Sequence, residues 1–545
     1  MKKNTPLAVG GVALILLFCI ARRDFWYPDE PDMAEITRNM LDSGDWLRLE
    51  LYEKLFADYP PLFFWLTSAF GRLFGLSEMV LRLPTALSAV GLLALTGFWA
   101  ERRLGERAAL WSVIVLGTMS HFVWQAVNMH VDMPFAFFIG GSLVCYDFYR
   151  TASGGRRWAL LAACSLLMGA ASLTKGPAGI VLPMGIIGVV HLFHGERRTI
   201  AVAAAAGAGA VLVFSAWAVI YARGAGESNL VYFVFRQNVS RFLTGHSHLQ
   251  PWYDYFVTIW GDLLPWSLFL PFAVAAAVGA ARRASRPITF ALAWMLVIFV
   301  FFTLSRSKRQ VYLLPMYPAV AILIGSFIDS LLTSTAKAKW AWRIGLVPAG
   351  AGIAVSGIAI PLLLPRFGEM LPGSSGIAAP LLMLSAAGIA AGAGVLIWIW
   401  RRPAIALRCI AGYGMAAAII GIGWLCPALD DPLSAKADAI WLNAQVTQGE
   451  AVGFYRPDGR MPKESSSLCF YGRLHMIVLS TAEQIASYRA EESDAVFLVD
   501  DHNLPYLEQI VGGPVSVVRD MRIGSDSILA VTVSAPGKLA SLPCH

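Results

Sequence analysis

Long apolar runs recur along this chain and constrain its fold more than any other feature. Thirteen runs reach or approach the roughly 20 residues that a helix needs to cross a bilayer. They lie at residues 7–23, 78–99, 108–126, 133–149, 157–174, 177–194, 199–222, 255–280, 287–304, 310–333, 343–364, 377–400 and 404–426. Only 14% of the residues are charged, against about 25% in an ordinary soluble domain. The sequence therefore predicts a polytopic α-helical membrane protein of about 13 spans, and it excludes a disordered chain and a soluble enzyme.

The loops between these runs alternate in charge, which predicts their sidedness. One set is short and basic, and the positive-inside rule makes it cytoplasmic. It includes residues 102–107, 150–157, 197–198, 282–286 and 401–402. The other set comprises residues 24–77, residues 223–254 and the tail after residue 426. We therefore expect a cytoplasmic N-terminus, and an odd number of spans then places the tail outside the cytoplasm.

The tail, residues 427–545, differs in composition from the rest of the chain. Strand-like runs such as 451–455 alternate with helix-like runs such as 482–489. This alternation is typical of a small α/β domain, and a segment of this length can bury its own core. We predict a transmembrane domain over residues 1–426, with amphipathic loops at 24–77 and 223–254, and an extracytoplasmic α/β domain over residues 427–545.

The first outside loop carries the most informative sequence, YPDEPDMAEI at residues 27–36. A proline suits the first turn of a helix, and an acidic residue suits its N-terminus. Apolar residues then recur at helical spacing up to a candidate helix stop, at Met33, Ile36, Met40 and Gly44. We predict a short amphipathic helix on the membrane surface. Asp29 and Glu30 at its start are candidate catalytic acids, with capping of the helix as the alternative role for Asp29.

Isolated polar groups at the outside ends of other spans form a second set of candidates. They are His130, Asp132, Lys175, Arg236, Arg241, Arg306, Lys308, Arg309 and Tyr312. Arginine and lysine bind phosphate, arginine in a bidentate manner, and a carboxylate can act as a general base. Ionisable groups at membrane depth are costly and usually functional. Together they predict a site for an anionic lipid headgroup beside a reacting neutral group.

His246 and His248 form a candidate metal-binding pair. Two histidines spaced i, i+2 on a strand or loop can chelate a metal, and Asp58 is a candidate third ligand. The alternative is an ordinary surface pair. We predict that the protein needs no cofactor, and a divalent cation at this pair stays open.

Five motifs occur in an order that resembles a known family. They are YPDE…AEI…SGDW from residue 27, the proline pair at 60–61, LTKGP at 173–177, RF…PWYDY at 241–255 and SK…YLLP at 307–315. The chain thereby resembles the bacterial inner-membrane transferases that move 4-amino-4-deoxy-arabinose onto lipid A. Those enzymes belong with the protein mannosyltransferases among the integral-membrane glycosyltransferases of the C-type fold.

The resemblance implies the C-type fold, a donor sugar on undecaprenyl phosphate, and transfer to an acceptor at the periplasmic face of the inner membrane. One catalytic carboxylate, without a second nucleophilic one, indicates a single inverting displacement. The resemblance also implies roles for individual residues. Asp29 matches the catalytic aspartate, Asp132 an aspartate near the sugar, and Tyr312 the tyrosine that holds the donor phosphate. Arg241, or else Arg236, matches the phosphate-binding arginine. We count Lys175, Arg306 and Lys308 as further substrate-binding candidates.

Two positions depart from the family pattern. The family has Glu-Lys before the proline pair, where this chain has Asp58-Tyr59. The change removes a cation, which Lys54, Lys308 or Arg306 would replace, and Tyr59 becomes a candidate substrate contact. The family also tends to have Arg-Tyr after the Asp-Glu pair, where this chain has Pro31-Asp32.

Other functions are weighed against this one. The same reaction with mannose or another hexose, onto protein or another glycolipid, is the first alternative. A flippase or transporter for lipid-linked sugars is more remote, because transporters usually place ionisable groups near the bilayer midplane and show inverted repeats. A third is a non-catalytic assembly or sensor protein that binds through its tail. None of these readings involves nucleic acid.

Overall fold

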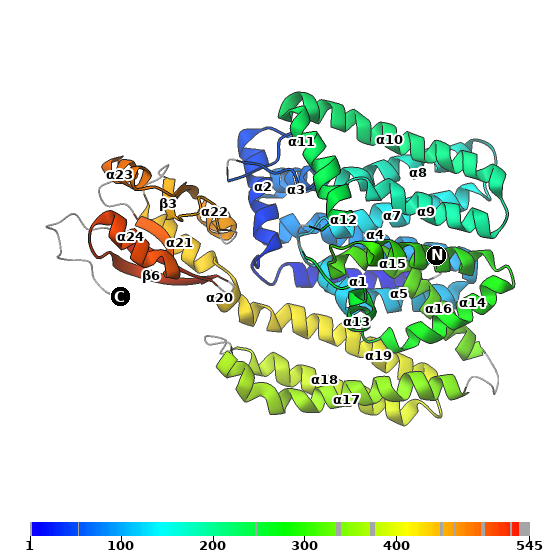
Figure 1. Ribbon diagram of the computed structural model, residues 1–545. Coiled ribbons are helices and arrows are strands. Elements are labelled where there is room, and N and C mark those ends of the chain that lie inside the picture. The colour runs from blue at the N-terminus through cyan, green and yellow to red at the C-terminus, as the bar shows by residue number, and fades with distance from the viewer. Residues whose placement is uncertain are drawn as a thin grey trace.

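The computed structural model describes residues 3–52, 54–245, 248–333, 339–370, 376–446, 451–462, 465–491, 496–523 and 526–532. It shows a helical bundle with a smaller unit at one end that carries the C-terminal strands (Figure 1). The longer elements of the bundle are α1 (Asn4–Ile20), α4 (Glu78–Leu104), α5 (Glu106–Thr118), α6 (Ser120–Ala126), α7 (Asp132–Tyr149), α8 (Gly154–Lys175), α9 (Ala178–Phe193), α10 (Arg197–Ala225), α13 (Asp254–Asp262), α14 (Leu270–Arg282), α15 (Arg286–Leu304), α16 (Tyr317–Thr333), α17 (Lys339–Met370), α18 (Ala378–Trp398) and α19 (Pro403–Ala417).

Shorter pieces complete the bundle. They are α11 (Glu227–Val231), the π-helical segment η1 (Tyr232–Ser240), α12 (Arg241–Leu243), the 3₁₀ turns η2 (Ser267–Phe269) and η3 (Gln310–Met316), and the π-helical segment η5 (Ala418–Leu425). Within the described residues, eight helices are long and apolar enough to cross a membrane, or ten if each of two bent pairs is one span. The chain is therefore a multi-pass membrane protein, although fewer helices pass this test than the thirteen predicted.

Residues 255–280, predicted as one span, are broken. α13 and the helical segment Ser267–Arg282 meet at 119°. Pro265 lies in the break, where it has no N–H to continue a helix. A second break, a 68° bend between α5 and α6, lies against the first. The Ser120 N–H from this bend donates to the Leu264 carbonyl at 2.8 Å, so the interrupted backbones satisfy each other.

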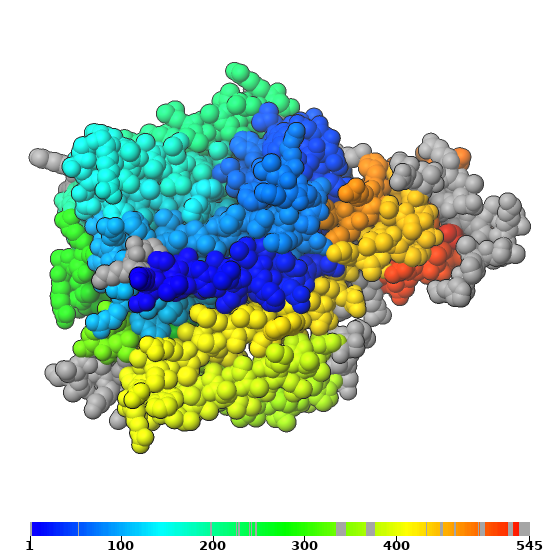
Figure 2. All heavy atoms as spheres, turned by 180° about the vertical axis from the view of Figure 1, so that it is seen from behind, coloured from blue at the N-terminus to red at the C-terminus, as the bar shows by residue number. Residues whose placement is uncertain are grey.

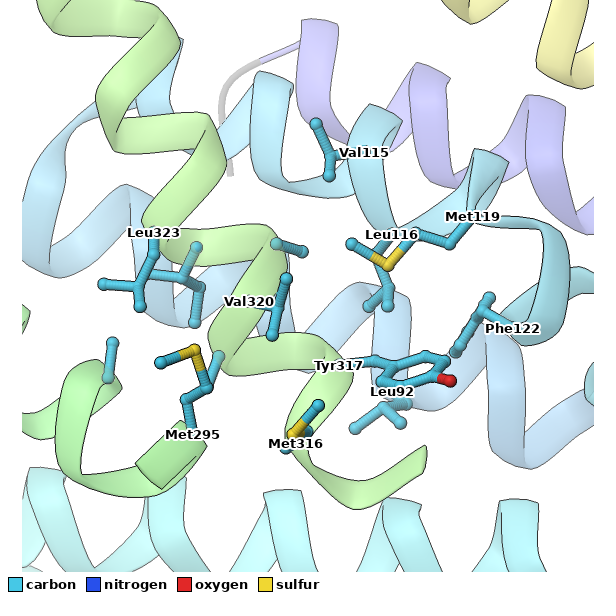
Figure 3. Packing of buried hydrophobic residues seen from close by; sticks show 14 of the residues in the cluster. Leu92, Val115, Leu116, Met119, Phe122, Met295, Met316, Tyr317, Val320 and Leu323 are labelled. Atoms are coloured by element: carbon cyan, nitrogen blue, oxygen red, sulfur yellow. The ribbon is translucent and has the colours of Figure 1, made fainter. Parts of the chain in front are cut away.

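The bundle core is densest around α16. Figure 3 shows Tyr317 of α16 beside Leu116 and Met119. Gly325 allows α16 to approach α5 closely, because a Cβ there would lie 2.6 Å from the Ser112 backbone nitrogen. Helices in lipid gain little hydrophobic energy from association, so close packing over small residues is what holds them together.

The first loop folds as predicted into a short amphipathic helix, α2 (Asp29–Ser43). It ends at Gly44, whose positive φ of 70° suits glycine and whose N–H donates to the Met40 carbonyl at 3.1 Å. A two-stranded ribbon, β1 (Glu50–Leu51) and β2 (Lys54–Leu55), and α3 (Leu62–Phe74) follow. Met33 and Ile36 turn inward and are buried with Phe63 of α3.

The tail contains a five-stranded mixed sheet in the order β4-β3-β5-β7-β6. β3 runs parallel to β4 and β5, and β7 runs antiparallel to β5 and β6. Its strands are β3 (Ala451–Tyr455), β4 (His475–Leu479), β5 (Val496–Asp500), β6 (Ser516–Ile523) and β7 (Asp526–Thr532). Its helices are α20 (Asp430–Leu433), α21 (Lys436–Gln445), α22 (Ser465–Gly472), α23 (Ala482–Glu491) and α24 (Leu504–Val511).

Candidate active site

Asp29 is the first residue of α2, directly after Pro28 at the N-cap position. Its carboxylate forms an ion pair with Arg309 and lies 3.7 Å from His130 Nε2. The side chain is 36% exposed and lines a cavity of about 140 Å³ with these two partners. Asp29 thus makes these contacts across the fold, with the bundle, which differs from the capping role considered as the alternative.

The same neighbours set the ionisation of Asp29. Burial favours the neutral acid, but His130 and Arg309 outweigh it and hold the pKa of the Asp29 carboxyl below its usual value. Asp29 is therefore a carboxylate at neutral pH. It can orient a hydroxyl or stabilise positive charge at a reacting carbon, and it is a weak base.

Asp132 lies at the start of α7 and is 1% exposed. One carboxylate oxygen pairs with the Lys175 ammonium from the end of α8, and the other lies 2.6 Å from His130 Nδ1. His130 therefore stands between the two aspartates, with Nδ1 toward Asp132 and Nε2 toward Asp29. The structure thus brings together the two aspartates that the sequence predicted. His130 links them, a connection that the sequence did not predict.

A larger cavity of about 310 Å³ lies beside Lys175, the ion-pair partner of Asp132. Tyr59, Lys175 and Tyr312 line it, as do Phe242 and Phe301. The Lys175 Nζ lies 4.4 Å from the centre of the Tyr312 ring. Burial raises the pKa of the Tyr59 hydroxyl, so this group stays a neutral donor. A cation and two phenols, together with the Asp58 carboxylate, thus line a largely apolar space. A lining of this kind can bind an anionic headgroup that carries an apolar chain.

Glu30 belongs to a different network from its neighbour Asp29. It is 4% exposed, and its oxygens accept hydrogen bonds from Arg23 at 2.6 Å and from Arg82 at 2.8 and 2.9 Å. The Met129 N–H adds a further bond at 2.8 Å. Despite burial, the two arginines lower the pKa of Glu30 to about 2. This saturation favours a role in holding the loop to the bundle over the catalytic role that the sequence suggested.

The remaining predicted cations lie outside this arrangement. Arg306 is exposed, and the buried Lys308 ammonium donates to the Ser305 carbonyl. Neither is among the described residues that line the two cavities. Arg241 lies in α12, and its side chain is outside the described part of the structure. Arg309 is instead the cation beside Asp29.

The predicted metal pair cannot be placed, because His246 lies outside the described residues. Among the residues that are described, no group of three or more His, Cys, Asp or Glu side chains is arranged to hold a metal ion. The question of a divalent cation stays a prediction.

Comparisons with known proteins show a likeness to membrane glycosyltransferases. Residues 58–221 match the family model for dolichyl-phosphate-mannose-protein mannosyltransferase. An undecaprenyl phosphate-alpha-4-amino-4-deoxy-L-arabinose arabinosyl transferase of Pseudomonas aeruginosa is 28% identical over 59% of each chain. An uncharacterised protein of Aquifex aeolicus is 30% identical over 61% of this chain and 65% of its own. The chain thus spans less than two thirds of the length of these relatives.

Solved structures show the fold. The crystal structure of ArnT from Cupriavidus metallidurans bound to undecaprenyl phosphate superposes with a TM-score of 0.76 at 23% identity, over 97% of this chain and 98% of that one. The archaeal oligosaccharyltransferase AglB from Archaeoglobus fulgidus superposes with a TM-score of 0.55 at 12% sequence identity. The superposition covers 94% of this chain and 71% of that one. In sequence and fold, the chain resembles glycosyltransferases of the C-type fold.

Proposed function

We propose that this protein moves a sugar from an undecaprenyl-phosphate-linked donor to an acceptor at the periplasmic face of the bacterial inner membrane. The observation that carries the proposal is the row of contacts from Asp29 through His130 and Asp132 to Lys175. This row joins a small polar cavity to a larger apolar one. The likeness to lipid-linked sugar transferases supports the same reaction class.

The larger cavity suits the donor. Lys175 and the hydroxyls of Tyr59 and Tyr312 would match the charge of the phosphodiester, while Phe242 and Phe301 would contact the polyprenyl chain. Arg241 directly precedes Phe242 and stays a proposed phosphate ligand. Fixed cations beside the departing phosphate lower the barrier because they stabilise charge that develops in the transition state.

The chemistry is a single displacement at the anomeric carbon. An acceptor oxygen forms the new bond to this carbon, and the bond from carbon to the phosphate oxygen breaks. Undecaprenyl phosphate leaves with both electrons of that bond. Asp29 would face the acceptor side, where it takes the proton of a hydroxyl acceptor. With an acceptor that is already an anion, it would only stabilise the positive charge that develops at the anomeric carbon. The depressed pKa of Asp29 supports the second case.

The acceptor, by resemblance, is lipid A, and the sugar is 4-amino-4-deoxy-arabinose. A third cavity of about 560 Å³ supports a lipid acceptor, because its lining is mostly apolar. Trp124 lines both this cavity and the one that holds Asp29, so a lipid chain in one would continue to a headgroup in the other. Transfer of mannose or another hexose, onto protein or another glycolipid, is the alternative.

We also propose thirteen spans, a cytoplasmic N-terminus and an α/β tail in the periplasm. Arg22 and Arg23 run against the positive-inside rule in this orientation, and their contacts explain why. The Arg22 Nε donates to the Gly423 carbonyl at 3.1 Å, and Arg23 pairs with Glu30. The charge of buried Arg23 is thus matched within the protein, whereas exposed Arg22 is held by a backbone carbonyl.

Reconstituted protein tests the proposal. Proteoliposomes would receive undecaprenyl-phosphate-linked aminoarabinose and lipid A, and mass spectrometry would follow both lipids. We expect lipid A to gain one sugar as undecaprenyl phosphate appears. Transfer only from a mannosyl donor would favour the alternative, and movement of donor across sealed vesicles without glycosyl transfer would favour a flippase.

A further inference from the structure

The tail contacts the chain on both sides of Asp29. Figure 1 shows α22 of the tail next to α2, and Figure 2 shows tail atoms against the N-terminal segment from behind. α2 has only 15 residues, and isolated helices of this length are marginal in water. The position of Asp29 therefore depends on what holds α2 and the segment before it.

Two tail residues hold the segment before Asp29. The Tyr471 hydroxyl accepts the Phe25 N–H at 2.7 Å, and the two rings lie 6.1 Å apart. The Asp430 carboxylate accepts the Trp26 indole N–H at 2.7 Å and the Asp24 N–H at 3.2 Å. These bonds fix the backbone and one side chain within five residues of Asp29.

The charge on Asp24 is held by the tail as well. Ser434 Oγ donates to its carboxylate at 3.0 Å, and Lys436 Nζ lies 2.9 Å from it. The same Lys436 ammonium lies 2.6 Å from Glu78 at the start of α4. Lys436 thus ties the segment, the bundle and the tail together.

A third contact lies after Asp29. Ser466 Oγ donates a hydrogen bond to the Asp32 carboxylate in the first turn of α2. Phe470, 8% exposed, packs edge-to-face on Phe25 at 5.4 Å between ring centres and is buried with Met33. The tail therefore holds the chain three residues beyond Asp29 as well as before it.

We propose that the tail is a positioning element for the active site, and that Tyr471 and Asp430 are positioning residues that set Asp29 against Arg309 and His130. This inference rests on the proposed function. A displacement of about 1 Å at a reacting group costs about 100-fold in rate, so loss of one of these bonds is measurable in catalysis. The donor cavity is lined from other parts of the chain, so donor binding does not depend on these bonds.

The test compares two tyrosine variants of the full chain. Tyr471→Phe removes the bond to Phe25 and keeps the ring. Tyr488→Phe is the matched control, because the Tyr488 hydroxyl also accepts a backbone N–H, that of Gly453 at 3.0 Å, but inside the tail. We expect Tyr471→Phe to lower kcat about 10-fold with the donor KM unchanged, and Tyr488→Phe to leave kcat within twofold of wild type.

Hydrogen exchange gives a readout that does not depend on activity. Tyr471→Phe should speed amide exchange in a peptide covering residues 24–32, and Tyr488→Phe should not. A second pair of variants changes Asp430. Asp430→Asn keeps an acceptor oxygen and should retain most of the wild-type kcat. Asp430→Ala removes the acceptor and should lower kcat about as much as Tyr471→Phe does.

The outcomes separate this inference from the proposed function. Wild-type kcat and exchange in Tyr471→Phe, or equal loss in both tyrosine variants, would overturn the positioning role while leaving the transferase intact. A wild-type protein that transfers no sugar would overturn the proposed function. In that case, faster exchange over residues 24–32 in Tyr471→Phe alone would still support the structural hold of the tail on this segment.

Discussion

Arg309 forms an ion pair with Asp29 although 280 positions separate them in the chain. The pair joins the turn before η3 to the first residue of α2. It places a permanent positive charge beside the carboxylate that we assign to the reaction. The ionisation of Asp29, and with it the pH dependence of transfer, should therefore respond to Arg309.

Arg309→Met should move the acid limb of the pH–rate profile upward. In the wild type, His130 and Arg309 hold the pKa of Asp29 below its usual value. Asp29 therefore stays ionised through the neutral and mildly acidic range, and transfer should not fall on its account there. Removing the guanidinium raises the Asp29 pKa, so kcat/KM should begin to fall at a higher pH. An acid limb that does not move would show that Asp29 does not control the rate.

Lys175→Met should destabilise the protein more than the double variant Lys175→Met with Asp132→Asn. Lys175 is 13% and Asp132 1% exposed in their side chains, and breaking a buried ion pair costs about 3–5 kcal/mol because the remaining charge is left unmatched. Thermal unfolding in detergent would measure this coupling. If the loss of stability in the double variant equalled the sum of the losses in Lys175→Met and Asp132→Asn alone, the two residues would not be paired.

Glu30→Gln should reduce the amount of folded protein rather than the turnover of each folded molecule. The substitution leaves the buried guanidinium groups of Arg23 and Arg82 without their carboxylate, at a cost of about 3–5 kcal/mol. Glu483→Gln, at an exposed glutamate of α23, serves as the control. A normal yield of Glu30→Gln with a 100-fold lower kcat would instead restore the catalytic role predicted from the sequence.

Glu35 should make stability depend on pH in the opposite direction to Asp29. Burial raises the pKa of Glu35 to about 7, with Arg38 opposing the shift. Between pH 4.5 and about 7, the folded state thus keeps a proton on Glu35 that the unfolded chain has released. The free energy of unfolding therefore falls as the pH rises from 4.5 to about 7. Glu35→Gln cannot ionise, and its stability relative to wild type should rise by about 1–3 kcal/mol between pH 4.5 and pH 8. A constant difference between the two proteins would contradict the shift.

Much of the fold could be predicted because lipid imposes long apolar helices and charge bias between them. The amphipathic helix of the first loop was predicted from periodic apolar residues and a terminal glycine, and α2 has both. The break near Pro265 was missed because the run is long and apolar enough to cross a bilayer in spite of Asp262 and Pro265. The interrupted helix is stable at this position because the backbone at Ser120, far away in sequence, donates a hydrogen bond to the Leu264 carbonyl.

The site was predicted in its parts but not in its connections. Asp29, Asp132, Lys175 and Tyr312 each stood out as polar groups at the ends of apolar runs or by family resemblance. His130 and Arg309 were visible in the same segments, yet nothing in the local sequence ranks Arg309 above Arg306 or Lys308. Which of three neighbouring cations faces Asp29 depends on the backbone path into η3, which only the fold determines.

The most direct test of the account is the single-turnover rate of Asp29→Asn, measured as undecaprenyl phosphate released from a lipid-linked sugar donor in the presence of acceptor. Asp42→Asn, an exposed aspartate near the other end of α2, is the matched control. We predict a loss of about 10²–10³ for Asp29→Asn, because the charge that stabilises the transition state is removed, with normal insertion and donor binding, and wild-type release for Asp42→Asn. Wild-type release by a well-inserted Asp29→Asn protein would contradict the proposed active site.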